Sequence, residues 1–293
     1  AFKLEPKQKE VPIKNMLSTA LNIQLEDSIV KIGKQLWNSL LGEKGVFDWD
    51  GLKFLEESFS GNTQKEHNWD FRYLIIYDQK QKPILATFMT VGLWKDDMLA
   101  AVGASQTIEE ERRNDPYYLT SKVLSLGSLF TEGHHLYVNN EHPQKKEALN
   151  ELIGTLEKLE HTLGAKMIVL RDFNDDKDLH AFFQGQGFIR VQMPDSCAIE
   201  LNKEENLETY ISRLSSRNRK HLRKEILRIE DLLDIQIVQD VNLVQLEQIA
   251  ELYSNVHQNN LGLNTFSFPT KLFAKMRVHP NWEFITISPK DEP

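Results

Sequence analysis

The chain has 293 residues, a formal net charge of -8 and one cysteine, Cys197. The length allows two domains, and the acidic total argues against a general DNA-binding protein. A single cysteine excludes an intramolecular disulfide and a thiolate metal cluster and favours a reducing, cytoplasmic location, and no apolar run approaches the roughly 18–20 residues of a membrane span.

The first part of the chain alternates between helical and strand-like patterns. Residues 1–14 are polar, contain proline and lack periodicity, which is typical of a linker from an upstream segment. The elements predicted after it are a helix over 25–41 ended by Gly42, a helix over 50–59 capped by Asp48 or Asp50, a β-hairpin of strands 69–77 and 83–93, a short strand over 98–102 and a charged surface segment over 107–114.

The middle of the chain predicts a strand–helix–strand–helix succession. The elements are a central strand over 124–130, a polar loop over 131–135, a helix over 143–163 ended by Gly164, a strand over 167–170 buried on both faces, a helix over 175–184 and strands over 188–191 and 197–201. This order predicts a mixed α/β domain up to about Leu201.

The last part begins with one long amphipathic helix over 207–234. It is followed by a strand over 235–238, a helix over 243–257, a partly ordered piece over 266–273 and a terminal strand over 281–288. A second α/β unit therefore begins with similar elements. The final strand suggests an unfinished sheet, and we expect the chain to be a piece of a longer polypeptide.

The helix over 207–234 carries most of the positive charge that stands out in this acidic chain. No acidic residue occurs from Arg213 to Lys224, and cations recur at helical spacing. One interpretation is a solvated helix face. The other is a binding site for phosphate, carboxylate or an RNA backbone, because the planar guanidinium suits such groups. The candidate binding residues are Arg217, Arg219, Lys220, Arg223 and Lys224.

The loop after the central strand holds the candidate catalytic residues Glu132, His134 and His135. A carboxylate or imidazole there could take a proton from an amine. Alternatively, these are polar loop residues satisfied by local hydrogen bonds. Their spacing matches no zinc motif, so we predict no metal. A buried strand ends at three aspartates, which are either ligand-binding residues or parts of a turn and helix cap: Asp172, Asp175 and Asp176.

Two stretches resemble the GNAT acyltransferases. Residues 178–189, Asp-Leu-His-Ala-Phe-Phe-Gln-Gly-Gln-Gly-Phe-Ile, are similar to the closing helix and strand of that fold. Residues 214–224, Leu-Ser-Ser-Arg-Asn-Arg-Lys-His-Leu-Arg-Lys, resemble the basic helix that follows the first half of tandem, FemAB-like GNAT proteins. Residues 116–138 also resemble the middle of a first half. The resemblance covers roughly 25–288 and implies a linker over 1–14, a first GNAT-like domain over 15–201 and a truncated second one over 202–293.

The resemblance implies transfer of an acyl group to an amine acceptor, which is a small molecule or a cell-wall precursor. The donor would be acetyl-CoA or another acyl-CoA, or an aminoacyl-tRNA. A fused upstream enzyme, of the pyridoxal-phosphate-dependent acyl-CoA condensing type, is a further implied partner. The sequence departs from the family in one respect: it contains no Arg/Gln-x-x-Gly-x-Gly/Ala turn, whose amides hold the pyrophosphate of CoA. A non-catalytic docking module of a larger enzyme therefore stays open as the alternative, and RNA binding as a third.

Overall fold

A computed structural model describes residues 20–44, 46–173, 176–191, 206–238 and 241–290. The chain divides into two compact units. The first contains Ala1–Asp96 and Leu119–Asn174, and the second contains Asp97–Tyr118 and Asp175–Pro293. Residues 97–118, which lie between two strands of the first unit in sequence, therefore belong to the second unit.

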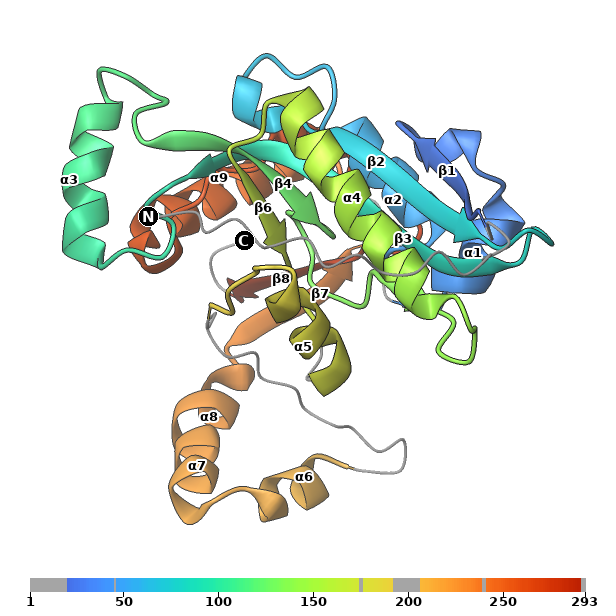
Figure 1. Ribbon diagram of the computed structural model, residues 1–293. Coiled ribbons are helices and arrows are strands. Elements are labelled where there is room, and N and C mark those ends of the chain that lie inside the picture. Colours follow the sequence, from blue (N-terminus) through green and yellow to red (C-terminus); the bar gives the residue numbers. More distant parts are fainter. Residues whose placement is uncertain (1–19, 45, 174–175, 192–205, 239–240, 291–293) are drawn as a thin grey trace. The chain divides into compact units, whose positions relative to one another are not determined.

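The first unit is built on a mixed sheet with the strand order β1-β2-β3-β4-β6, and β5 pairs with β3 (Figure 1). The strands are β1 Asn22–Glu26, β2 Asp70–Tyr77, β3 Pro83–Lys95, β4 Thr120–Leu126, β5 Tyr137–Val138 and β6 Met167–Leu170. Each pairing is antiparallel except that of β4 with β6, which is parallel. The predicted mixed α/β fold is confirmed.

Helices cover both faces of this sheet: α4 (Lys145–Leu163) lies on one face, and α1 (Lys34–Leu41) and α2 (Trp49–Ser58) lie on the other (Figure 1). Short 3-10 turns occur at Ile29–Lys31 and Lys65–His67. Asp48 caps α2 by accepting a hydrogen bond from the Gly51 amide at 2.7 Å. Gly164 ends α4 at a φ of 65°.

The structure corrects three predictions, two in this unit and one, over residues 98–102, in the second unit. The predicted helix over 25–41 is wrong in its first half, where β1 and a 3-10 turn precede α1. β1 escaped notice because its two large apolar residues, Ile23 and Leu25, stay 45% and 39% exposed. The predicted strand over 98–102 is a turn leading into a helix. β6 is not buried on both faces, since Met167 is 44% exposed.

The second unit contains helices and a two-stranded antiparallel ribbon of β7 (Leu233–Val238) and β8 (Phe284–Pro289). The longer helices are α3 Val102–Arg112, α5 Lys177–Gly185, α9 Leu243–Asn259 and α10 Thr270–Met276, with a 3-10 turn at Leu261–Leu263. The order β7-α9-α10-β8, with its strands antiparallel, repeats the order β1-α1-α2-β2 of the first unit.

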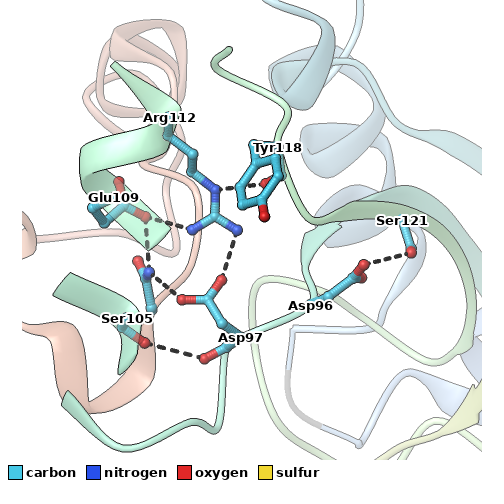
Figure 2. Close-up of polar contacts among 8 residues, drawn as sticks. Asp96, Asp97, Ser105, Glu109, Arg112, Tyr118 and Ser121 are labelled. Carbon is cyan, nitrogen blue, oxygen red and sulfur yellow. Dashed lines mark hydrogen bonds and ion pairs between the residues drawn. The ribbon is translucent and has the colours of Figure 1, made fainter. Parts of the chain in front are cut away.

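A buried polar network joins α3 to the turn at Leu261–Leu263 within the second unit (Figure 2). Arg112 donates to Asp97 and to Glu109, each at 2.6 Å, and to the Tyr118 carbonyl at 2.9 Å. The Asn264 amide donates to both carboxylates at 2.8 Å. Glu109 and Arg112 were predicted to lie on a charged surface. Instead, Arg112 and Asp97 have side chains only 4% and 3% exposed.

Two further predictions in the second unit are wrong. Residues 188–191 do not form a strand, and the expected strand over 197–201 lies outside the described residues. The single helix predicted over 207–234 is also wrong. It is divided into α6 Leu207–Arg213, α7 Ser216–His221, a π turn at Leu222–Ile226 and α8 Leu227–Glu230. The break has a local cause: Leu214 is extended, and Ser215 caps α7 by accepting from the Asn218 amide at 3.3 Å.

Candidate functional site

The candidate site lies where the parallel strands β4 and β6 end together. Leu126 pairs with Leu170, and the Arg171 amide donates to the Leu126 carbonyl at 3.3 Å. Beyond this point both chains turn away with positive φ, at Gly127 (99°) and Asp172 (55°). The carboxyl ends of parallel strands are where α/β sheets place ligands. Both loops that leave these ends carry titratable side chains.

His135 lies under the turn at Gly127. A Cβ on Gly127 would come within 2.7 Å of the His135 ring, so glycine is required there for close approach as well as for its φ. The His135 ring is 2% exposed and contacts three aromatic rings edge-on or tilted, those of Phe47, Phe88 and Phe173. His135 is therefore a packed residue at the base of the loop.

The protonation of His135 follows from its hydrogen bond. Its Nε2 lies 2.6 Å from the carbonyl oxygen of Arg171, so Nε2 carries the proton and donates it. Burial lowers the pKa of His135 to about 4, and the ring is neutral near pH 7. Nδ1 is buried and has no hydrogen-bond partner among the described residues. Nδ1 is therefore the unprotonated nitrogen, and a role for His135 in proton transfer would require a proton donor to reach it.

Glu132 and His134 are exposed residues of the same loop. The loop is shaped by Ser128, whose Oγ accepts from the amides of Phe130 and Thr131 at 3.0 and 3.1 Å. Partial burial, and secondly the charge of Lys44, lowers the pKa of His134, which favours the neutral imidazole. Of the predicted catalytic residues, these two are therefore the ones open to a substrate.

Arg171 and Asp172 are the residues that the sequence argument undervalued. Arg171 donates to the Ser128 carbonyl at 2.9 Å and lies 5.9 Å from the centre of the Trp94 ring. Asp172 has a buried Oδ2 that finds no hydrogen-bond partner among the described residues, and the Arg171 Nε lies 3.8 Å from it. Burial raises the pKa of Asp172, Arg171 lowers it, and the charge of Glu132 raises it further. Glu132 and Asp172 are thus close enough for their charges to interact, although they come from different loops.

A non-glycine residue with positive φ beside a ligand-binding edge of a sheet is a strained feature that often marks function. In the sequence, Asp172 looked like one of several turn aspartates. Only the pairing of β4 with β6 brings it toward Glu132.

Several backbone amides of the loop between β4 and α4 already donate hydrogen bonds within the protein. Besides those of Phe130 and Thr131, the Gly127 amide donates to the Phe88 carbonyl at 2.9 Å. At the start of α4, the Gln144 amide donates to His142 Nδ1 at 3.2 Å, and His142 Nε2 lies 3.3 Å from Asp78. These contacts agree with the lack of a pyrophosphate turn in the sequence.

The basic segment, residues 213–224, lies in the second unit. Some of its basic side chains form hydrogen bonds or ion pairs within the chain, and others are exposed. Arg219 donates to the carbonyls of Ser212 and Leu214 at 3.0 and 2.7 Å, and Arg223 pairs with Glu208 at 2.8 Å. The other three predicted binding residues are exposed, and no hydrogen bond or ion pair holds them within the described chain: Arg217, Lys220 and Lys224.

No protein-family model matches the sequence, and no curated protein matches it significantly. Among solved structures, an aminoglycoside N-acetyltransferase in complex with CoA is 15% identical over 67% of this chain and 99% of its own, with a TM-score of 0.36. An aminoglycoside 6'-N-acetyltransferase from Acinetobacter baumannii is 14% identical over 62% of this chain and 100% of its own, with a TM-score of 0.36. A ribosomal-protein-alanine N-acetyltransferase from Brucella melitensis biovar Abortus 2308 is 13% identical over 62% of this chain and 100% of its own, with a TM-score of 0.33. All three similarities are weak.

Within the described ranges, no three histidine, cysteine, aspartate or glutamate residues gather as metal ligands would. None of the helices in this part of the chain combines the length and the apolar character that crossing a bilayer requires.

Proposed function

We propose that the chain is a GNAT-type N-acyltransferase region that moves an acyl group from a thioester or tRNA donor to an amine acceptor. The observation that carries the proposal is the parting of β4 and β6 at Gly127 and Asp172, beside Glu132 and His134. This geometry separates the chains at the carboxyl ends of two paired strands, with proton acceptors next to them. The first GNAT-like half would span 15–201 and the second would begin at 202.

The proposed reaction is a direct transfer. The acceptor ammonium loses a proton to Glu132, His134 or Asp172, and the free amine then attacks the acyl carbonyl. A C–N bond forms and the C–S bond of the thioester, or the C–O bond of the aminoacyl ester, breaks. The leaving group takes up a proton. Backbone amides would stabilise the oxyanion, and positioning of the two substrates would supply much of the rate.

The donor is proposed to be acetyl-CoA or another acyl-CoA, with aminoacyl-tRNA as the other candidate. Arg217, Lys220 and Lys224 would contact its anionic groups, while Arg219 bonds to backbone carbonyls of that segment and Arg223 pairs with the Glu208 side chain. The acceptor would be a small amine or a cell-wall precursor, and a fused upstream enzyme is a candidate partner. Both donors occur in the cytoplasm, so the proposal includes a cytoplasmic location.

A transfer assay tests this function. The whole chain is incubated with radiolabelled acetyl-CoA and a panel of primary amines, and labelled amide is counted. We expect transfer that rises with pH until the base is unprotonated, and a loss of roughly 10²-fold or more in Asp172→Asn, Glu132→Gln or His134→Gln, whichever residue is the base. The matched control is Glu147→Gln, on the first turn of α4. Equal rates in all four variants would contradict the assigned site.

The amides of the β4–α4 loop that already donate hydrogen bonds favour one alternative, a docking module that binds no donor. Such a module would show neither acetyl-CoA binding nor transfer. It would bind another domain of the larger enzyme instead.

A further inference from the structure

The segment from α6 to α8 is not one helix, because the chain bends between α6 and α7 at Leu214 and Ser215. Arg219 reaches back to two carbonyls at the end of α6 and lies 3.2 Å from Ser216 Oγ. Arg223 reaches to Glu208 in the first turn of α6. Two of the basic side chains therefore hold the bend, and they are not available to a partner in this conformation.

The remaining cations form a row along the continuous stretch from α7 through the π turn to α8. In a regular α-helix a four-residue step overshoots a full turn by ~40°, so residues spaced by four drift around the axis. A π turn takes more residues per turn, which offsets this drift. The π turn at Leu222–Ile226 lies between Lys220 and Arg228, with Lys224 inside it. Lys220, Lys224 and Arg228 therefore stay in line.

These three cations are exposed, and in the described part of the chain no ion pair or hydrogen bond engages their side chains. Each four-residue step advances about 6 Å along the axis, so the row is about 12 Å long. It is a line of charge, which suits a surface or an extended polyanion better than one compact anion.

The same stretch also exposes large aliphatic side chains. Ile226 is 49% exposed, Ile229 is 39% exposed, and Leu232, just after α8, is 64% exposed. A short helical stretch that combines exposed aliphatic residues with lysine and arginine is typical of helices that lie in the headgroup region of a bilayer. A surface for single-stranded nucleic acid would call for aromatic side chains among the cations, and the stretch from Ser216 to Leu232 contains none other than His221.

We propose that residues 216–232 dock on an anionic bilayer surface, with Lys220, Lys224 and Arg228 on phosphate headgroups and Ile226, Ile229 and Leu232 in the headgroup boundary. The proposal goes beyond the proposed function, which assigns Lys220 and Lys224 to the donor: it adds lipid headgroups as a second anionic partner of the exposed row. Vesicle binding is measured without donor or acceptor. It can fail while transfer in solution succeeds, and the reverse also holds.

The test is co-sedimentation of the whole chain with phosphatidylcholine vesicles that contain 0–40% phosphatidylglycerol. Binding should increase with the anionic fraction and decrease with salt. Lys220→Gln/Lys224→Gln/Arg228→Gln should weaken it about a hundredfold, because one basic residue near an anionic surface contributes about a fivefold factor. Ile226→Ser/Ile229→Ser should weaken binding even at low salt.

The matched control is Lys80→Gln/Lys82→Gln/Lys158→Gln, which removes three exposed cations from the first unit and should leave binding unchanged. Circular dichroism confirms that each variant is folded. Equal binding by the control and the row variant would overturn the proposal, and so would binding to a single-stranded RNA probe without binding to vesicles. Loss of binding in the row variant alone would support it.

Discussion

Replacement of His135 by glutamine should change how the stability of the protein depends on pH. The folded state holds His135 with a pKa of about 4, below the ordinary 6.5. As pH falls, the unfolded chain therefore takes up this proton first, and the stability that the neutral ring contributes is complete above pH 6.5 and is lost toward pH 4. The difference of about 2.5 pKa units corresponds to ~3 kcal/mol in the free energy of unfolding.

Glutamine can still donate an amide hydrogen to the Arg171 carbonyl, but it does not titrate. His135→Gln should be less stable than wild type at pH 7.5, because it loses ring contacts with Phe47, Phe88 and Phe173. Its stability should then fall by ~3 kcal/mol less than that of wild type between pH 7.5 and 4. Urea unfolding at several pH values measures this difference. His161→Gln, on the exposed surface of α4, serves as control. Parallel pH profiles for wild type and His135→Gln would refute the reasoning.

Two further substitutions test the packing around the site and the network of the second unit. Gly127→Ala should lower the free energy of unfolding by roughly 2 kcal/mol or more, because its Cβ would meet the His135 ring and its φ is positive. Gly154→Ala, a glycine of α4 with nothing within 4 Å of the added carbon, should instead stabilise by about 0.5–1 kcal/mol in the same urea assay. Arg112→Met should cost about 3–5 kcal/mol, since it leaves Asp97 buried without its cation, whereas the exposed Arg113→Met should change stability by less than ~0.5 kcal/mol. If thermal unfolding of the two arginine variants coincided, the network would not be the stabilising element inferred here.

Patterns confined to one element predicted their structure well. Asp48 with the apolar face after it predicted α2, and Gly164 predicted the end of α4. The β2–β3 hairpin followed from alternation and a turn-like connection. In each case the signals that decide the structure lie within a few residues of one another.

Features that depend on distant residues could not be predicted. Arg112 looked like a surface residue because its partner Asp97 lies 15 positions away in the sequence, and Asn264, which also bonds to Asp97, lies 167 positions from Asp97. The basic helix looked continuous because the spacing of its apolar and basic residues is helical throughout. That spacing does not show that the Ser215 side chain accepts a hydrogen bond from the Asn218 amide and so begins a new helix there.

The candidate site was predictable in part. The loop with Glu132 and His134 follows from a polar run after an apolar strand. That His135 faces inward follows only from the aromatic residues of β3 and of the α1–α2 loop around it. The proximity of Asp172 to Glu132 required the parallel pairing of β4 with β6.

Isothermal titration of the whole chain with acetyl-CoA tests the proposed function most directly. We predict saturable binding that weakens as salt increases, and that weakens further when Arg217 is replaced by glutamine. The absence of binding, together with the absence of aminoacyl-tRNA binding under the same conditions, would contradict the acyltransferase account and leave the docking module.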